Sequence, residues 1–182
     1  MSSTDTGAAF LSGTIARLRA TKALGDGVLG QVSDAELFLL SDAEANSIAI
    51  IVRHLHGNML SRWTDFLTTD GDKPTRQRDR EFEQPATDRN EVLRLWEEGW
   101  ACTFQALEPL TPSDVLREVR IRGEPLTVLD AILRQLAHYS YHVGQMVTLA
   151  RQQLGSRWQT LSIARGKSQD YRPVERASGT KE

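Results

Sequence analysis

Cysteine is almost absent from this chain of 182 residues. Cys102 stands alone, so an internal disulfide and a cysteine-rich zinc site are both excluded. We interpret Cys102 as a small hydrophobic side chain of the core, because free cysteine is among the most buried residue types.

Long hydrophobic runs are also missing. The longest aliphatic run covers residues 48–52, which is far short of a membrane span. Residues 1–7 contain neither a basic region nor the start of a long apolar region, so no secretory signal is expected. We therefore expect a cytoplasmic protein that has no membrane partner.

Neither sign of charge dominates the sequence. Twenty-two basic and 24 acidic residues give a net charge of −2, which does not favour binding to nucleic acid. A hydrophobic content of 40% with 25% charged residues is typical of a globular protein. The length fits one domain over residues 1–182, whose polar end, from about 170 to 182, is expected to be disordered.

The spacing of apolar residues predicts four long helices. Three- and four-residue steps place them at about 4–30, 43–67, 88–107 and 127–153. Residues 75–87 form a charged loop that is either functional or mobile, and residues 115–125 predict a short extended or hairpin segment. The sequence therefore predicts an all-α fold, and a four-helix bundle is its default form.

Two histidines lie four residues apart in the last predicted helix. His138 and His142 share one face of that helix, close enough to hold one ion, and imidazole is a common ligand for divalent metals. Both, however, fall away from the centre of the helix's apolar stripe. The pair is therefore interpreted either as part of a metal site or as two solvated side chains.

The second predicted helix offers a third ligand. His54 lies on a polar strip with Asn58 and Arg62, whereas His56 lies about 200° further round the helix. Both cannot point at one ion. The polar neighbours favour His54, but spacing alone leaves the choice open.

Longer motifs resemble one branch of the DinB/YfiT-like superfamily of metalloenzymes. No reaction is assigned to that branch. The motifs include HLHGNMLSRW at 54–63 within residues 47–74, IRGEP at 121–125, RQLAHYSYHVGQ at 134–145 and WQTLSIARGKS at 158–168. The resemblance extends over about residues 37–168. It implies a bacterial protein with a four-helix bundle of the DinB/YfiT type.

The resemblance also implies a ligand set. In that superfamily one histidine of the second helix and an HxxxH pair of the fourth helix hold a divalent metal, which corresponds here to His54, His138 and His142. Zinc or nickel is the expected metal, and iron or manganese would also suit the ligands. Four residues are expected beside the metal or on the substrate: Asn58, Arg62, Gln145 and Tyr141.

Relatives in the superfamily include transferases that use low-molecular-weight thiols such as bacillithiol or mycothiol. The resemblance therefore implies a metal-dependent thiol transferase that acts on a small-molecule thiol and an electrophile. The arginine-rich loop 69–83 is expected to cover the pocket, or else to be an ordinary solvated loop.

Two further hypotheses remain open at this stage. One is a non-enzymatic, stress-linked protein whose metal ion mainly stabilises the bundle. The other is a homodimer that associates through the helix carrying Trp96 and Trp100, although two tryptophans four residues apart are more often core residues.

Overall fold

Capping side chains set where three of the long helices begin in the computed structural model, which describes residues 3–83 and 88–170. Ser47 accepts a hydrogen bond from the backbone of Ile50 and starts one helix. Asp88 and Thr127 start two others in the same way. Each cap satisfies a backbone N–H that would otherwise lack a partner in the first turn.

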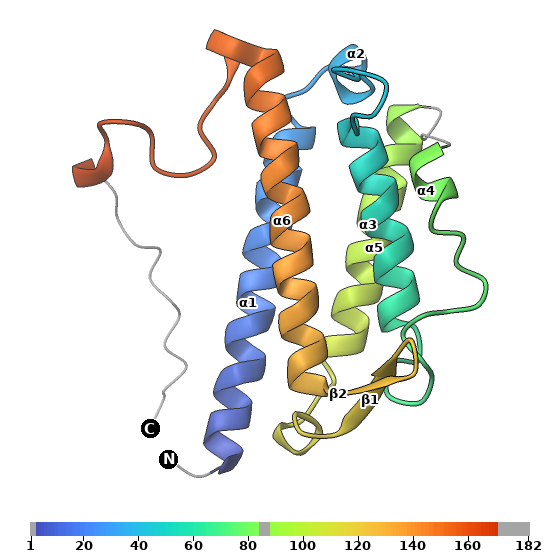
Figure 1. The fold of residues 1–182 in the computed structure, drawn as a ribbon. Coiled ribbons are helices and arrows are strands. Elements are labelled where there is room, and N and C mark those ends of the chain that lie inside the picture. Colours follow the sequence, from blue (N-terminus) through green and yellow to red (C-terminus); the bar gives the residue numbers. More distant parts are fainter. Residues whose placement is uncertain (1–2, 84–87, 171–182) are drawn as a thin grey trace.

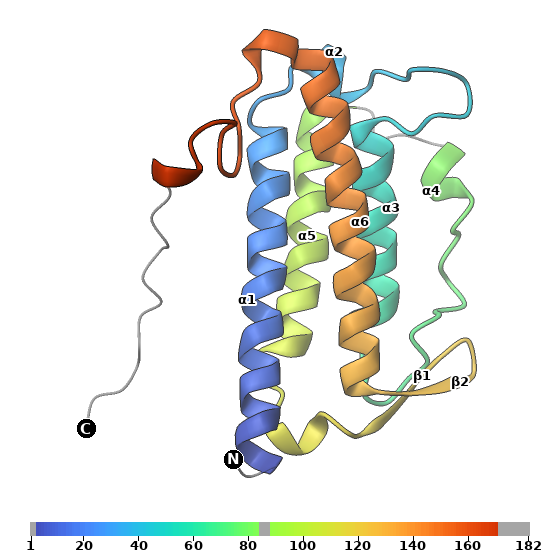
Figure 2. The same cartoon turned by 60° about the vertical axis from the view of Figure 1, so that its left-hand side comes forward.

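Four long helices lie side by side in both ribbon views (Figures 1 and 2). They are α1 (Ser3–Leu29), α3 (Ile48–Trp63), α5 (Arg89–Leu107) and α6 (Val128–Leu154). The shorter elements are α2 (Asp34–Leu37), α4 (Arg80–Glu83), β1 (Glu118–Ile121), β2 (Glu124–Thr127) and the 3₁₀ turns η1 (Pro112–Asp114), η2 (Gly155–Arg157) and η3 (Ser168–Asp170). The described residues are mainly helical, which confirms the all-α class. An antiparallel hairpin over 118–127 overlaps the segment predicted at 115–125 and extends two residues beyond it.

The limits of the second predicted helix were wrong at both ends. Helix α3 starts at Ile48 rather than near 43, because the Asp42 side chain accepts from the backbone of Glu44 and forms a local turn. The helix stops at Trp63 rather than at 67, and Asp65 follows with a φ of 48°. Within the predicted loop 75–87, residues 80–83 form α4. Residues 84–87 of that loop lie outside the described residues, as does the end predicted to be disordered, about 170–182, from residue 171 onward.

The core fills the space between the four long helices. Trp96 and Trp100 are 2% and 0% exposed, with their rings edge to face and 5.5 Å apart. Trp63 donates a hydrogen bond of 2.8 Å to the hydroxyl of Tyr139, which satisfies both buried polar groups. The two tryptophans of α5 are therefore core residues and cannot supply the exposed contact face considered for a homodimer.

None of the described helices is long and apolar enough to cross a membrane.

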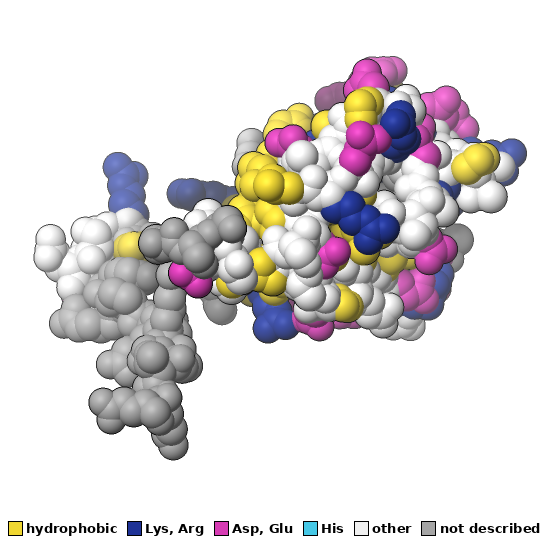
Figure 3. All heavy atoms as spheres, turned by 90° about the horizontal axis from the view of Figure 1, so that it is seen from below, with side chains coloured by type: hydrophobic (Ala, Val, Ile, Leu, Met, Phe, Trp, Pro, Cys, Tyr) yellow, Lys and Arg dark blue, Asp and Glu magenta, His cyan; other side chains and the backbone are white. Residues whose placement is uncertain are grey.

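The hairpin end of the molecule is a mixed surface. Seen from this end, charged side chains of both signs surround smaller groups of hydrophobic ones (Figure 3). Leu116, which lies between η1 and β1, is 76% exposed.

The segment after α3 is attached to the turn of the hairpin. Arg122 and Gly123 form that turn, both with positive φ, and their backbone N–H groups donate to the carboxylate of Asp70 at 2.8 and 2.7 Å. The backbone N–H of Gly71 also donates to the carbonyl of Arg120. These contacts fix the middle of residues 64–79, which we call the connecting segment.

Replacing Asp70 by alanine should lower the free energy of unfolding by about 1 kcal/mol, because its carboxylate accepts from backbone N–H groups on two segments. Those hydrogen bonds hold the pKa of Asp70 below its usual value of 3.8. The stabilisation should therefore be present at neutral pH and lost as the pH falls below that value. Urea denaturation at pH 7 and pH 3 measures both effects. Asp79→Ala, at a carboxylate that is 89% exposed, is the control and should change little.

Candidate metal centre

Helices α3 and α6 bring three histidines together. His54 comes from α3, and His138 and His142 come from successive turns of α6. Their candidate ligand atoms all lie within 4.8 Å of one another, and the Nε2 atoms of His54 and His138 are 3.2 Å apart. His54 is 4% exposed, and the other two are half-buried. The three residues expected to share a site therefore lie together.

The protonation states of these imidazoles suit metal binding. Burial, together with the neighbouring His142 and His54, lowers the pKa of His138 to about 3. Burial and His54 also lower the pKa of His142. Histidine binds a metal in its neutral form, so at pH 7 these two residues are already in the state that a metal requires.

The outer nitrogens of two histidines are held by fixed acceptors. His54 Nδ1 lies 2.9 Å from Glu81 Oε2, and His142 Nδ1 lies 2.8 Å from Gln145 Oε1. An oxygen acceptor at Nδ1 places the proton there and leaves the lone pair on Nε2, as is usual for metal-ligating histidine. His138 Nδ1 has no such acceptor, so His138 can donate a proton from Nε2 to the Nε2 of His54 or turn a lone pair there toward a metal.

The spacing of the nitrogens also fits a metal. Two nitrogens bound to one tetrahedral zinc at about 2.0–2.1 Å would be about 3.3 Å apart, close to the 3.2 Å between His54 and His138. In the described residues, the group of candidate ligands contains these three histidines and no fourth histidine, cysteine or carboxylate. A metal held by three protein ligands keeps a position for water or substrate.

A buried ion pair supports the site. Arg76 donates to the two carboxylate oxygens of Glu81 at 2.8 and 2.9 Å, and the two side chains are 7% and 8% exposed. Burial alone would raise the pKa of Glu81, but the hydrogen bonds from His54 and Arg76 outweigh it and lower that pKa. Glu81 is thus ionised at neutral pH and orients the imidazole of His54.

Gly57 of α3 leaves room for the side chain of Glu81. A Cβ atom on Gly57 would lie 2.3 Å from Glu81 Oε1, closer than non-bonded atoms approach. Phe82 follows Glu81 on α4, and its ring lies 4.8 Å from the ring of His54. Helix α4 therefore packs against α3 directly over the candidate site.

Sequence reasoning missed Glu81 and Arg76 as individual residues. The available signal was the long charged loop around Phe82, which was predicted to be functional or mobile. The structure shows that part of this segment is buried rather than solvated, since Glu81 is 7% exposed.

The other four residues expected near the metal take different positions. Asn58 is 6% exposed, and its Oδ1 has no hydrogen-bond partner among the described residues. Gln145 contacts His142 directly, whereas Tyr141 is 62% exposed and accepts a hydrogen bond from Gln145. Arg62 is buried, and its hydrogen bonds go to Ser61, Gly71 and Asp72. It therefore holds the connecting segment against α3.

His56 points away from the candidate centre, as its position on the helix predicts. Its Nε2 lies 3.4 Å from a carboxylate oxygen of Glu98 on α5. The prediction that His54 and His56 do not converge on one ion is thus confirmed.

These observations define a mainly helical protein with a three-histidine candidate metal site between two of its long helices. Residues 5–167 match the family model described as protein of unknown function (DUF1572), and the chain belongs to that family, which lies within the DinB/YfiT-like superfamily. The match confirms the superfamily inferred from the motifs and includes α1 as well. Comparisons with curated proteins and with solved structures found no match.

Proposed function

We propose that this chain is a four-helix bundle of the DinB type that binds a divalent metal through His54, His138 and His142. The observation that carries the proposal is the 3.2 Å separation of two Nε2 atoms whose imidazoles lie in a largely buried site. The anchored outer nitrogens of His54 and His142 support it further. Zinc or nickel suits an all-imidazole ligand set, and iron or manganese would also bind.

We further propose that the protein is a transferase for a low-molecular-weight thiol. A divalent metal, when bound with an open position, lowers the pKa of a thiol or water and polarises a carbonyl group. In the overall reaction the thiol loses its proton, its sulfur bonds to an electrophilic carbon, and the leaving group departs. The support for this reaction is the set of three protein ligands and the membership of the superfamily.

Asn58 is our candidate for a substrate contact. It lies one turn after His54 on α3, and its buried Oδ1 has no hydrogen-bond partner among the described residues. A buried acceptor without a partner is costly, and a donor on the substrate would satisfy it. Asn58 would then orient the substrate beside the histidines.

The transferase proposal predicts turnover that requires both metal and thiol. The metal-stripped protein and the same protein reloaded with zinc or nickel would be assayed with bacillithiol, mycothiol, glutathione or cysteine and 1-chloro-2,4-dinitrobenzene. We expect activity only after reloading, and Asn58→Ala should lower kcat/KM about tenfold through loss of one hydrogen bond to substrate. Absence of turnover with every thiol and metal would contradict the transferase role.

The alternative function is a non-enzymatic metal-binding protein. It is favoured by the burial of His54, Glu81 and Arg76, which connects a bound ion to packing between α3 and α4. In that case metal at a hundred times its Kd would raise the stability by about 2.7 kcal/mol. Thermal denaturation with and without metal, beside the turnover assay, separates the two functions.

A further inference from the structure

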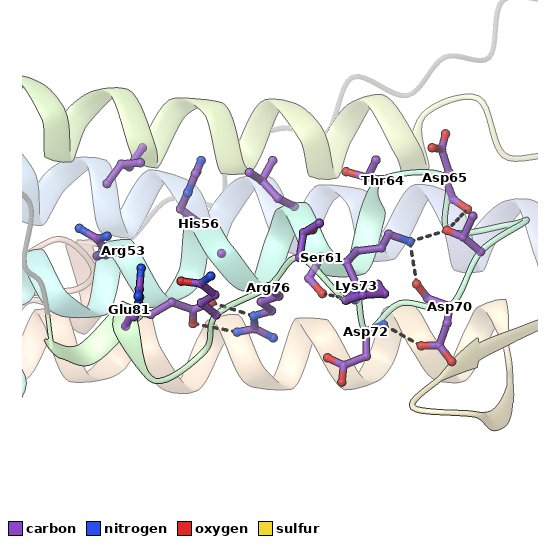
Figure 4. Close-up of a pocket in the computed structure, with 18 of the residues that line it drawn as sticks. Arg53, His56, Ser61, Thr64, Asp65, Asp70, Asp72, Lys73, Arg76 and Glu81 are labelled. Atoms are coloured by element: carbon purple, nitrogen blue, oxygen red, sulfur yellow. Dashed lines mark hydrogen bonds and ion pairs between the residues drawn. The ribbon is translucent and has the colours of Figure 1, made fainter.

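A second concave surface lies on the side of α3 that faces α5. Its floor is α3, and its walls are the N-terminal part of α5 and the connecting segment (Figure 4). We call this surface the α3–α5 groove. Its volume of about 1090 Å³ is slightly above the usual range of ligand pockets, about 300–1,000 Å³. Arg76 and Glu81 line it, but the three histidines do not, so the groove is separate from the candidate metal centre.

The middle of the groove is apolar. Leu60 is 38% exposed there, whereas Leu55, Met59 and Trp63 on the same helix are almost completely buried. Leu95 of α5 also lines the groove. A single exposed leucine needs no explanation, but a leucine in the floor of a groove offers contact area to an apolar part of a ligand.

One end of the groove carries an arginine without a partner among the described residues. Arg53 is half-buried and has no hydrogen bond or ion pair with the described residues, although arginine is rarely buried without a partner. His56 is not free in the same way, because its Nε2 faces a carboxylate oxygen of Glu98 at 3.4 Å. Arg53 and His56 lie toward the same end of the close-up (Figure 4).

Most of the acidic side chains in the lining are already occupied. Asp70 accepts from three backbone N–H groups, Asp72 pairs with Arg62 and Arg122, and Glu81 pairs with Arg76. Asp70 and Asp72 lie toward the opposite end from Arg53 in Figure 4. Arg53 is therefore the charge without a partner at its end of the groove.

We propose that the α3–α5 groove binds a small organic anion. The carboxylate or phosphate of this anion lies against Arg53, and the apolar part lies on Leu60 and Leu95. Arg53 supplies the charge-assisted hydrogen bonds that anions favour, and the leucines supply burial of apolar surface. The site does not depend on a metal at the three histidines.

The test uses the full chain as purified, labelled with ¹⁵N, and three probes with the same apolar body. Hexanoate, hexyl phosphate and hexylamine are titrated, and amide shifts report where each binds. We expect both anions to shift residues of α3 and α5 around the groove, and hexylamine to shift none of them. The tighter of the two anions identifies the head group that the site takes.

Variants decide whether the assigned residues bind the anion. Arg53→Gln should weaken binding about tenfold, because a hydrogen bond from a charged group is lost, and Arg17→Gln on the exposed side of α1 should leave it unchanged. Leu60→Glu, at an already exposed position, should abolish anion binding without unfolding the chain. The proposal is overturned if hexylamine binds as well as the anions, if shifts occur away from the groove, or if both groove variants keep the original affinity.

Discussion

His138→Ala is expected to lower the affinity for zinc by at least about a hundredfold, because replacing even an outer partner of a metal ligand costs about 10–100-fold. This residue is the cleanest one to remove. It is half-buried, its Nδ1 has no hydrogen-bond partner among the described residues, and its truncation removes only the 3.2 Å contact with Nε2 of His54. A competition titration against a chromophoric chelator measures the affinity, and metal analysis after dialysis measures the content.

A matched control lies two residues from another ligand. His56 is on the same helix as His54 but contacts Glu98 on α5, so His56→Ala should keep full metal content. His54→Ala should lose the metal as His138→Ala does, although it also deprives Glu81 of a partner. If His54→Ala and His138→Ala both retain the metal content of the unaltered protein, the proposed ligand set is wrong.

Glu81→Ala should lower the free energy of unfolding by about 3–5 kcal/mol, the usual cost of leaving one partner of a buried ion pair alone. Arg76 would remain 7% exposed without its carboxylate, and His54 would lose the acceptor that orients it. The affinity for zinc should fall by about 10–100-fold, because His54 loses that acceptor. Denaturation without metal and chelator competition with metal measure the two losses separately.

Helix α4 also supplies the control for this prediction. Glu83→Ala removes an exposed carboxylate two residues away and should change neither stability nor affinity by much. Glu81→Gln keeps an oxygen for His54 but removes the charge that faces Arg76, so it should affect stability more than zinc affinity. Equal behaviour of Glu81→Ala and Glu83→Ala would show that the buried ion pair does not support the site.

Glu81 also makes the free energy of unfolding depend on pH in the acidic range. The pKa of Glu81 lies below its usual value of 4.5 in the folded protein, because the hydrogen bonds from His54 and Arg76 outweigh the effect of burial. Its ion pair therefore stabilises the fold above that value, and the contribution is lost as the pH falls through the lowered pKa.

The sequence by itself determined the helical class and the sharing of one face by His138 and His142. Both are consequences of local periodicity, since a spacing of four residues places two side chains on the same side of any α-helix. Helix limits were less certain for an equally local reason. The Asp42 side chain bonds to the backbone and delays α3 until Ser47 caps it.

Only the tertiary structure decided which polar surfaces face each other. The two histidines of α6 lie off the centre of its apolar stripe. Periodicity was therefore as consistent with two solvated side chains as with a metal site. Packing of α3 against α6 turns that flank toward His54, and the chain returns 27 residues later to place Glu81 on the same imidazole. The α3–α5 groove also depends on packing, because α5 and the connecting segment fold back along α3. Contacts between distant segments depend on how whole helices pack, and no local spacing encodes them.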